Sequence, residues 1–286
     1  MASKRPTVDL AALRPSVSLR FLYNTPPGRL LLKALTRPNL SKLVGRVLSS
    51  SFSKAFIPRF IRKNHIDVDR YDLSGVRSYN DFFSRPLKPS ALQVEGGLIS
   101  PCDAKLTAYP ITKDALFTIK GSVYDLREIL GGDDALAETF QGGVCLIFRL
   151  SVDNYHRYCY FDDCEELRWR FIPGVLHTVQ PIAFHHYNIY HRNCREYTVL
   201  DTAHFGTAVQ LEVGALCVGK IENYHQSGPH KRGQEKGKFL FGGSTVVVLL
   251  REGAAQIDPE ILENTRKGLE TVVTMGEQIG AAASQP

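Results

Sequence analysis

The chain has 286 residues, of which 43% are hydrophobic and 22% are charged, an ordinary composition for a globular protein. This composition excludes a chain that is disordered throughout, a collagen and a coiled coil. The longest apolar runs are the size of a strand and fall far short of the ~18 residues that a membrane-spanning helix needs, so we expect no such helix.

The formal net charge of +6 is unevenly distributed along the chain. Residues 1–63 contain thirteen Lys and Arg residues and a single acid, Asp9, and so carry +12. The remaining residues then carry −6. Such an asymmetry points to a polyanionic partner for the N-terminal segment.

Residues 1–75 combine this charge with a helical pattern of apolar residues. Apolar side chains recur every three or four positions between Phe21 and Ile61, which is a helical spacing. Prolines at positions 26, 27, 38 and 58 limit each helix to a few turns. Basic amphipathic helices rich in Phe and Leu bind the interface of anionic membranes, so we predict a membrane-associating segment.

Other interpretations of this segment stay open. A helical cap packed on the main domain would have the same solvated basic face. A nucleic-acid surface is disfavoured because no aromatic-interleaved binding motif accompanies the charge. An organellar transit peptide is disfavoured because the pattern runs straight into the following domain. The prediction is a peripheral membrane protein that binds an anionic surface and no nucleic acid.

Six cysteines are scattered along the chain without a CxxC pair, at positions 102, 145, 159, 164, 194 and 217. The sequence starts without the basic and apolar regions of a secretory signal. We therefore expect free thiols on the reducing, cytoplasmic-face side of a membrane, with an organellar membrane as an alternative.

From about residue 64 the pattern changes to a series of short strands. Apolar, β-rich runs occupy residues 98–99, 104–109, 116–119, 144–150, 167–172, 197–200, 208–218 and 238–250. Glycines and prolines separate them, as in an all-β sandwich or barrel. Short helices are expected at residues 79–83, 124–130 and 259–267, the last with Asp258 as its N-cap. The predicted class is α+β, with a β-dominated core preceded by N-terminal amphipathic helices.

The turn Gly242-Gly243-Ser244-Thr245 lies between two of these apolar strands. Two glycines allow a sharp bend with strained backbone angles, which opens the Gly243 carbonyl to attack by the Ser244 hydroxyl. The attack would turn the peptide bond into an ester. β-Elimination would then break the chain, and hydrolysis of the resulting dehydroalanine would leave a pyruvoyl group. Most turns of this composition are plain hairpins, so the motif alone is a weak signal.

Two further residues give this turn a chemical context. Asp103 lies in Ser-Pro-Cys-Asp at a turn between strands, and His156 lies in an apolar, aromatic run. With Ser244 they would supply an orienting carboxylate, a base and a nucleophile if folding brings them together. The alternative for Asp103 is a turn cap, and the alternative for His156 is a hydrogen-bonded core residue.

Eight blocks between about residues 75 and 250 form a pattern that is more specific than any single motif. They are Phe82-Phe-Ser-Arg-Pro-Leu-Lys88, Ser100-Pro-Cys-Asp103, Lys120-Gly121 with Tyr124-Asp-Leu126, Asn154-Tyr-His-Arg157, Pro173-Gly174, Asn193 with Arg195, Val213-Gly-Ala215 with Val218-Gly219, and Gly237-Lys-Phe239 through Gly-Gly-Ser-Thr245. Taken in this order, they resemble the phosphatidylserine decarboxylase family.

The resemblance implies that the chain cuts itself between Gly243 and Ser244. The products would be a large (β) chain, residues 1–243, and a small (α) chain, residues 244–286, whose 43 residues begin with a pyruvoyl group made from Ser244. Asp103 and His156 take the positions of the family's aspartate and first histidine, both catalytic. Residues 76–286 would form the catalytic domain, a barrel–sandwich hybrid in which residues 272–280 make a closing hairpin.

The sequence departs from the family pattern at three places. Cys159 stands where a second histidine is common, and Ala104 stands where glycine follows the aspartate. The processing turn also has one additional glycine. The missing histidine leaves the base of self-cleavage open: His156 could serve both reactions, or Cys159 as a thiolate, or His177, could take over.

The resemblance also implies the reaction, which converts phosphatidylserine to phosphatidylethanolamine and CO2. The ketone made from Ser244 would form a Schiff base with the serine amine and accept the electrons released with CO2, so no external cofactor is required. His156 is the candidate proton donor to the α-carbon. Two alternatives stay open: a pyruvoyl enzyme acting on a soluble amino acid, and a non-catalytic lipid-binding module that no longer cuts itself.

One group of metal-ligating residue types carries less weight. His185, His186, His191 and Cys194, with His204 nearby, match no standard zinc spacing. We expect a polar loop and no metal there.

Overall fold

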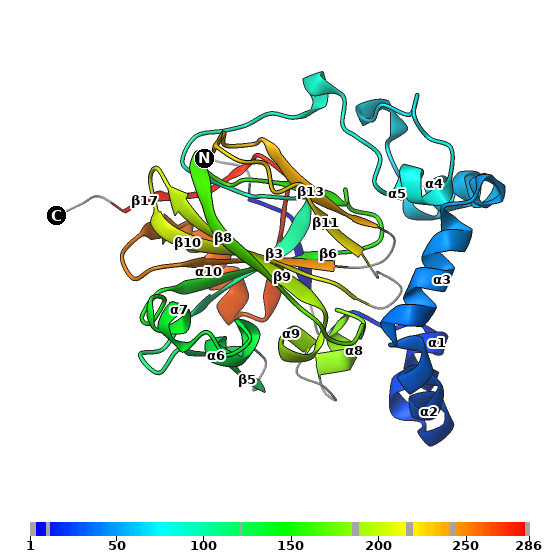
Figure 1. Cartoon of the computed structure of the whole chain (residues 1–286), viewed down its shortest axis with the longest axis horizontal. Coiled ribbons are helices and arrows are strands. Elements are labelled where there is room, and N and C mark those ends of the chain that lie inside the picture. The colour runs from blue at the N-terminus through cyan, green and yellow to red at the C-terminus, as the bar shows by residue number, and fades with distance from the viewer. Residues whose placement is uncertain are drawn as a thin grey trace.

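The computed structural model describes residues 4–9, 12–119, 122–184, 189–215, 220–240 and 244–283. Its centre is a nine-stranded sheet in which every pair of neighbouring strands is antiparallel (Figure 1). In spatial order the strands are β1 (Thr7–Asp9), β16 (Leu269–Val273), β3 (Ala104–Pro110), β6 (Val144–Leu150), β14 (Ser244–Leu250), β10 (Gly206–Val213), β9 (Arg195–Thr202), β8 (Cys164–Ile172) and β12 (Pro229–His230).

The large sheet is buried on both faces at its centre. On β6 and β14, Phe148 and Val248 belong to one apolar core, while Ile147 and Val247 belong to a second core on the opposite face. Successive side chains of a strand point to opposite faces. A strand that is covered on both faces therefore has an unbroken apolar sequence, as these two strands do.

Different elements cover the two faces (Figure 1). The first core is covered by β7 (Arg157–Cys159), β11 (Lys220–Asn223) and β13 (Glu235–Leu240) in one small sheet, by β2 (Leu98–Ile99), β15 (Ala255–Ile257) and β17 (Gln278–Ala282) in another, and by α8 (Pro181–Phe184) and α10 (Pro259–Arg266). The second core is covered by β4 (Leu116–Ile119), β5 (Ser122–Asp125), α6 (Leu126–Ile129), α7 (Asp134–Glu138) and α9 (Ile189–Arg192). The large sheet is thus the middle of three layers.

The mixed α+β class with β-dominated sheets agrees with the prediction, but the described strands do not close into a barrel. The edge strands β1 and β12 are three and two residues long, and within the described ranges each pairs on one side only. The remaining strands pair in small sheets that lie on a face of the large one. The barrel part of the predicted core is therefore wrong.

The predicted closing hairpin over residues 272–280 is also wrong. β16 joins the large sheet, whereas β17 pairs with β15 and β2, so the turn between them connects two layers. In that turn Glu277 N–H donates to Thr274 O at 3.1 Å, and Gly276 has a φ of 87°, which glycine adopts without strain. The glycine that suggested a hairpin instead allows the chain to change sheets.

The three predicted short helices differ in outcome. Residues 79–83 form α5 (Tyr79–Phe83), and α10 ends one residue before the predicted end. Residues 124–130 divide between β5 and the short helix α6. Asp258 does occupy the N-cap position of α10, but its side chain makes no capping hydrogen bond there. Its carboxylate binds Arg5 at 2.8 Å instead.

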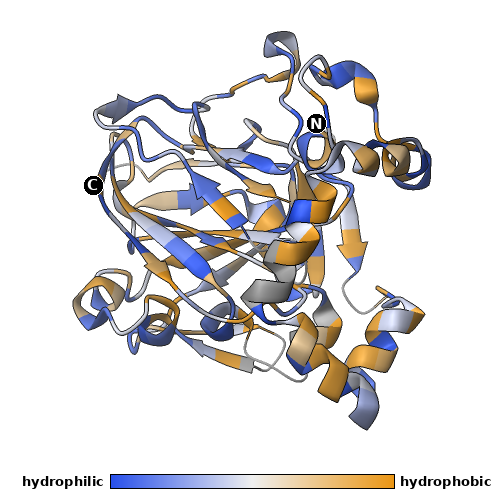
Figure 2. Cartoon of the chain, turned by 45° about the vertical axis from the view of Figure 1, so that its right-hand side comes forward, coloured by the Kyte–Doolittle hydropathy of each residue, from blue (hydrophilic) through white to orange (hydrophobic). Residues whose placement is uncertain are grey.

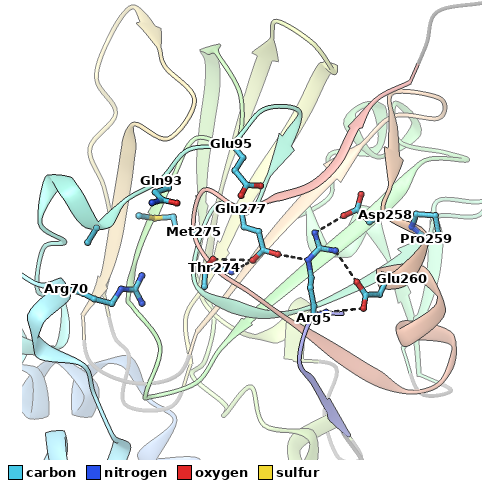
Figure 3. A pocket seen from close by; sticks show the side chains of 11 residues that line it. Arg5, Arg70, Gln93, Glu95, Asp258, Pro259, Glu260, Thr274, Met275 and Glu277 are labelled. Atoms are coloured by element: carbon cyan, nitrogen blue, oxygen red, sulfur yellow. Dashed lines mark hydrogen bonds and ion pairs between the residues drawn. The ribbon is translucent and has the colours of Figure 1, made fainter. Parts of the chain in front are cut away.

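Arg5 fastens the N-terminal residues to the C-terminal part of the chain (Figure 3). Its guanidinium donates to Glu277 at 2.5 Å and to Asp258 at 2.8 Å, and it lies 3.5 Å from Glu260. These side chains line a cavity of about 690 Å³. Because β1 follows Arg5 and pairs with β16, the N-terminal strand holds the part of the chain that follows Ser244.

Short helices form a column along one side of the sheet domain (Figure 1). They are α1 (Val17–Asn24), α2 (Pro26–Leu35), α3 (Pro38–Leu48), the 3₁₀ helix η1 (Ser51–Phe56) and α4 (Ile57–Asn64); the 3₁₀ turns η2 (Val68–Arg70) and η3 (Pro89–Ala91) flank α5. Several large apolar side chains on the column are exposed: Phe21, Leu30, Leu31, Leu43, Val47, Phe52 and Phe56. Figure 2 shows hydrophobic and hydrophilic stretches alternating along these helices. Across the described ranges, no helix has both the length and the apolar character to cross a bilayer.

Candidate active site at the start of β14

Ser244 is the first residue of β14, at the centre of the large sheet. It is fully buried and pairs with Leu150 of β6. On its other side Thr245 pairs with Val213 of β10, so the following residue of that chain, Gly214, comes next to Ser244. We call this region the Ser244 end of the sheet.

The Ser244 hydroxyl has no hydrogen-bond partner in the part of the chain that the structure describes. Leaving a buried hydroxyl unbonded costs roughly 1–3 kcal/mol, so such groups are rare in native proteins. Among the described residues, then, no hydrogen bond holds Oγ in place. Gly243, the other half of the predicted cleavage site, lies outside the described residues.

Asp103 directly precedes β3 and lies at the same end of the sheet. β3 pairs with β6, which pairs with β14, so Asp103 is two strand spacings, or ~10 Å, from Ser244 across the sheet. Its Oδ1 accepts from Met275 N at 2.9 Å, and its Oδ2 is 4.0 Å from Arg70 Nη1. Burial raises the pKa of Asp103, and the Met275 bond and the charges of Arg70 and Arg85 only partly oppose this effect.

His156 lies just before β7 and is tied to the strand that leads to Ser244. Its backbone carbonyl accepts from Phe239 N at 2.8 Å, and Phe239 is on β13, five residues before Ser244. The imidazole is fully buried against Phe83, with 3.9 Å between ring centroids. Its Nδ1 lies 2.8 Å from Asn154 O. Because a carbonyl only accepts, Nδ1 carries the proton, and Nε2 is the basic nitrogen of the neutral ring.

Cys159 occupies the position of the family's second histidine and lies close to this group. Its backbone N–H donates to Pro101 O at 2.9 Å, which joins β7 to the segment that carries Asp103. The thiol is fully buried. Burial raises the pKa of Cys159 to about 12, and the negative charges of Glu235 and Asp103 act in the same direction. These surroundings disfavour the Cys159 thiolate, which is one of the alternative bases for self-cleavage.

His177 reaches the Ser244 end from the opposite side, through Asn193. The Asn193 side chain accepts from His177 N at 3.0 Å and donates to Gly214 O at 2.7 Å. Burial, with the charge of Arg192, lowers the pKa of His177 to about 4. His177 is therefore neutral at physiological pH. The fold thus directs the segments of Asp103, His156, Cys159 and His177 toward one end of the sheet.

A buried ion pair between β10 and β13, near the Ser244 end, was not predicted from the sequence. Glu212 lies two residues before Gly214 on β10, and its Oε2 is 3.0 Å from Lys236 Nζ, with both side chains fully buried. Asn223 donates to Glu212 at 2.9 Å and accepts from Lys236 at 3.0 Å. Burial raises the pKa of Glu212. A charged residue inside the apolar run 208–218 was the signal that could have identified this pair.

Arg85, within the block Phe82 to Lys88, is a second buried cation near the site. Its guanidinium lies 4.0 Å from the centre of the Tyr71 ring and donates to Phe82 O at 3.1 Å. Its Nε and Nη2 have no hydrogen-bond partner among the described residues. A buried charge without an anionic partner is costly. Arg85 contributes positive potential near Asp103 and partly offsets the rise in the pKa of Asp103 that burial causes.

The histidine and cysteine group around residue 190 does not form a metal site within the described ranges. His185 and His186 lie outside them. His191 Nδ1 is 2.6 Å from Glu128, Cys194 Sγ donates to Gly174 O at 2.9 Å, and His204 Nδ1 is 2.9 Å from Asp162. The described part of the chain holds no group of three or more side chains able to bind a metal ion. The five described cysteines carry free thiols, and Cys217 lies outside these ranges.

A buried serine hydroxyl, with the segments of an aspartate, two histidines and a cysteine at the same end of the sheet, is typical of an enzyme active site. A family model described as phosphatidylserine decarboxylase matches residues 79–281. The chain is 44% identical over 266 residues to phosphatidylserine decarboxylase proenzyme 2 of Clostridium acetobutylicum, covering 92% of this chain and 91% of that protein. Identity to the phosphatidylserine decarboxylase proenzyme of Clostridium perfringens is 37% over 273 residues, or 92% of each chain. Identity to the phosphatidylserine decarboxylase proenzyme of Chlamydia caviae is 38% over 272 residues, which cover 92% of this chain and 91% of that protein.

The chain therefore belongs to the phosphatidylserine decarboxylase family. The resemblance on which the sequence analysis relied is confirmed.

Proposed function

We propose that this protein is a carboxy-lyase that converts phosphatidylserine to phosphatidylethanolamine and CO2. It is made as a proenzyme and cuts itself between Gly243 and Ser244. Membership of the family and the proenzyme names of its relatives support this function. The single observation that carries it is the buried Ser244 hydroxyl, which no described residue binds.

The residues around Ser244 fit a pyruvoyl group. Removal of Oγ breaks no hydrogen bond within the described chain, and alternation along β14 places residue 244 on the same face as Val246 and Val248 of the apolar first core. The group would be held at the start of β14, between β6 and β10. It supplies a ketone next to an amide, which takes up the electron pair that departing CO2 leaves behind.

His156 is assigned the proton transfers. In self-cleavage its Nε2 removes the proton of the Ser244 hydroxyl as Oγ attacks the Gly243 carbonyl, and the peptide becomes an ester. Elimination then removes the Cα proton, breaks the Cβ–Oγ bond and releases Gly243 as a carboxylate. Water hydrolyses the resulting dehydroalanine, the nitrogen leaves as ammonia, and a ketone remains. In the decarboxylation, Nε2 carries the proton that is delivered to the substrate α-carbon. We assign Asp103 a positioning role, because its carboxylate accepts a hydrogen bond from Met275 N.

The two predicted chains would remain together after cleavage. β14 of the small chain lies between β6 and β10 of the large chain, and β16 lies between β1 and β3. Arg5 adds ion pairs to Asp258 and Glu277 of the small chain. β17 of the small chain also pairs with β2 of the large chain. Separating the chains would break these five strand pairings at once, so we expect a single particle.

The N-terminal segment, residues 1–75, is assigned to an anionic membrane surface. Its residues 1–63 carry +12, and several large apolar side chains on its helices are exposed. Basic residues attract the anionic leaflet, and Phe and Leu enter its interface. A substrate anchored in a bilayer requires such a docking surface, so we assign the protein to a membrane periphery.

The first test is the mass of the purified wild-type protein. We expect two chains in place of one of 31.9 kDa, the smaller having the mass of residues 244–286 with a pyruvoyl terminus. Borohydride added with phosphatidylserine vesicles should attach the lipid amine to the small chain alone. A full-length mass and no carbonyl-dependent labelling would contradict the proposal. Equal turnover of free L-serine and the lipid would favour the soluble amino-acid substrate instead.

The membrane assignment has a separate test on α2. Leu30 and Leu31 are 71% and 48% exposed. Replacing both with serine should weaken co-sedimentation with anionic vesicles by at least about tenfold, since burying one leucine is worth ~1.5–3 kcal/mol. Self-cleavage should remain complete. The matched control is Val123→Ser on β5, which is 53% exposed and outside the segment; equal loss in both variants would exclude a docking role for α2.

A further inference from the structure

Tyr23 is one of the few side chains of α1 and α2 that are fully buried, and it carries a hydroxyl. On α1 and α2 only Tyr23, Gly28, and Leu32 are buried, whereas Phe21 and Leu30 beside them are exposed. A Cβ on Gly28 would lie 1.9 Å from Phe21 O, so only glycine permits α2 to fold back this closely onto α1. The pair of helices thus presents one tyrosine to the interior and most of its apolar surface to solvent.

The Tyr23 hydroxyl contacts the segment that precedes α8. Its Oη accepts from Thr178 N at 3.0 Å and lies 3.3 Å from His177 Nδ1. The hydroxyl can donate its proton to Nδ1 in the tautomer of His177 that carries the ring proton on Nε2. The end of α2 supports the same segment, because Leu176 N–H donates to Thr36 O at 3.0 Å.

From His177 an unbroken series of hydrogen bonds leads to the Ser244 end. The Asn193 side chain is fully buried and binds both backbone groups of His177, accepting from N at 3.0 Å and donating to O at 2.9 Å. Its amide also donates to Gly214 O at 2.7 Å. Gly214 N–H donates to Cys194 O at 2.9 Å, which fixes this residue from a second side. Gly214 follows the β10 residue that pairs with Thr245, and so adjoins Ser244.

We infer that Tyr23 is a positioning residue through which the N-terminal helices, once docked on a bilayer, hold the His177–Asn193 pair at the Ser244 end. This inference rests on the proposed function and adds a coupling between lipid binding and turnover. α1 and α2 bury only a few of their residues, so docking on a bilayer restrains these helices more than it restrains the sheet domain. A restraint on α1 reaches the site through the Tyr23 hydroxyl. A substrate monomer in solution gives no such restraint, so the coupling acts only on lipid in a membrane.

The test is Tyr23→Phe, which keeps the ring and removes only the hydroxyl. Turnover is measured on phosphatidylserine in vesicles and on a short-chain phosphatidylserine below its micelle concentration. Wild type should turn over the vesicle lipid faster. Y23F should cut itself completely and bind vesicles as wild type does. Its kcat on vesicles should be about 5- to 20-fold lower, because the contacts of the hydroxyl with Thr178 N and His177 Nδ1 are lost. Its rate on the monomer should be unchanged.

Tyr124→Phe is the matched control, because the buried Tyr124 hydroxyl on β5 has no hydrogen-bond partner among the described residues. It should equal wild type on both substrates. An equal fall of Y23F on vesicle and monomer would overturn the inference, as would a fall that weaker vesicle binding accounts for, or no fall. If the proposed function fails, wild type itself shows neither cleavage nor CO2 release, which separates the two failures.

Discussion

Replacing Ser244 with alanine is expected to leave a single chain of 286 residues with no decarboxylase activity. Without Oγ nothing can attack the Gly243 carbonyl, so neither the chain break nor the ketone forms. The loss is complete because both the cleavage and the later electron sink depend on this one side chain. Intact-mass spectrometry and release of labelled CO2 from carboxyl-labelled phosphatidylserine are the measurements.

The same variant should fold as well as wild type or better. Its hydroxyl is buried and has no partner in the described structure, so alanine removes an unsatisfied group. Thr198→Val on β9 is the matched control, because the Thr198 hydroxyl is also buried and unpartnered in the large sheet. This control should be cut completely and should be fully active. A cut S244A chain would remove Ser244 from the mechanism, and a cleavage failure in T198V would show that any change in the sheet blocks processing.

The sequence was a good guide where the physical signal is local. The apolar run that contains residues 244–250 predicted a strand, and β14 occupies these residues. The strand proves to be buried on both faces, as an unbroken apolar run requires. Asp103 and His156 were chosen because each lies in one of the blocks that resemble the family, and their catalytic roles stay predictions.

The sequence was a poor guide where partners are distant. The Gly276 turn is compatible with a hairpin, but the partners of β17 are strands that begin at residues 98 and 255, and no local pattern shows this. Similarly, Glu212 and Lys236 are separated by 24 positions, and their ion pair depends on two sheets packing face to face. The barrel prediction failed for the same reason. A sheet closes into a barrel only if its two edge strands pair, and no local pattern shows whether β1 and β12 do.

Replacing His156 with glutamine should lower kcat on phosphatidylserine by about 10²- to 10⁴-fold, the usual effect of losing a general acid or base. Glutamine keeps an amide that can still donate to Asn154 O, which the Nδ1 of His156 faces at 2.8 Å. It cannot exchange a proton as Nε2 does. If His156 serves both reactions, self-cleavage also slows, so the newly made variant contains uncut chain that decreases over hours. If another group is the base of cleavage, the variant is fully cut and yet inactive.

These two results show whether His156 is the base of self-cleavage. That question is open because Cys159 stands where the family commonly has a second histidine. Cys159→Ser tests the alternative base in the same assay, and we expect normal cleavage, because burial keeps that thiol protonated. His65→Asn is the matched histidine control: His65 is exposed and has a left-handed backbone with φ 51°, which asparagine tolerates. It should be cut and active. A fully active H156Q enzyme would remove His156 from both steps and direct attention to His177, the histidine that Asn193 links to the other side of Ser244.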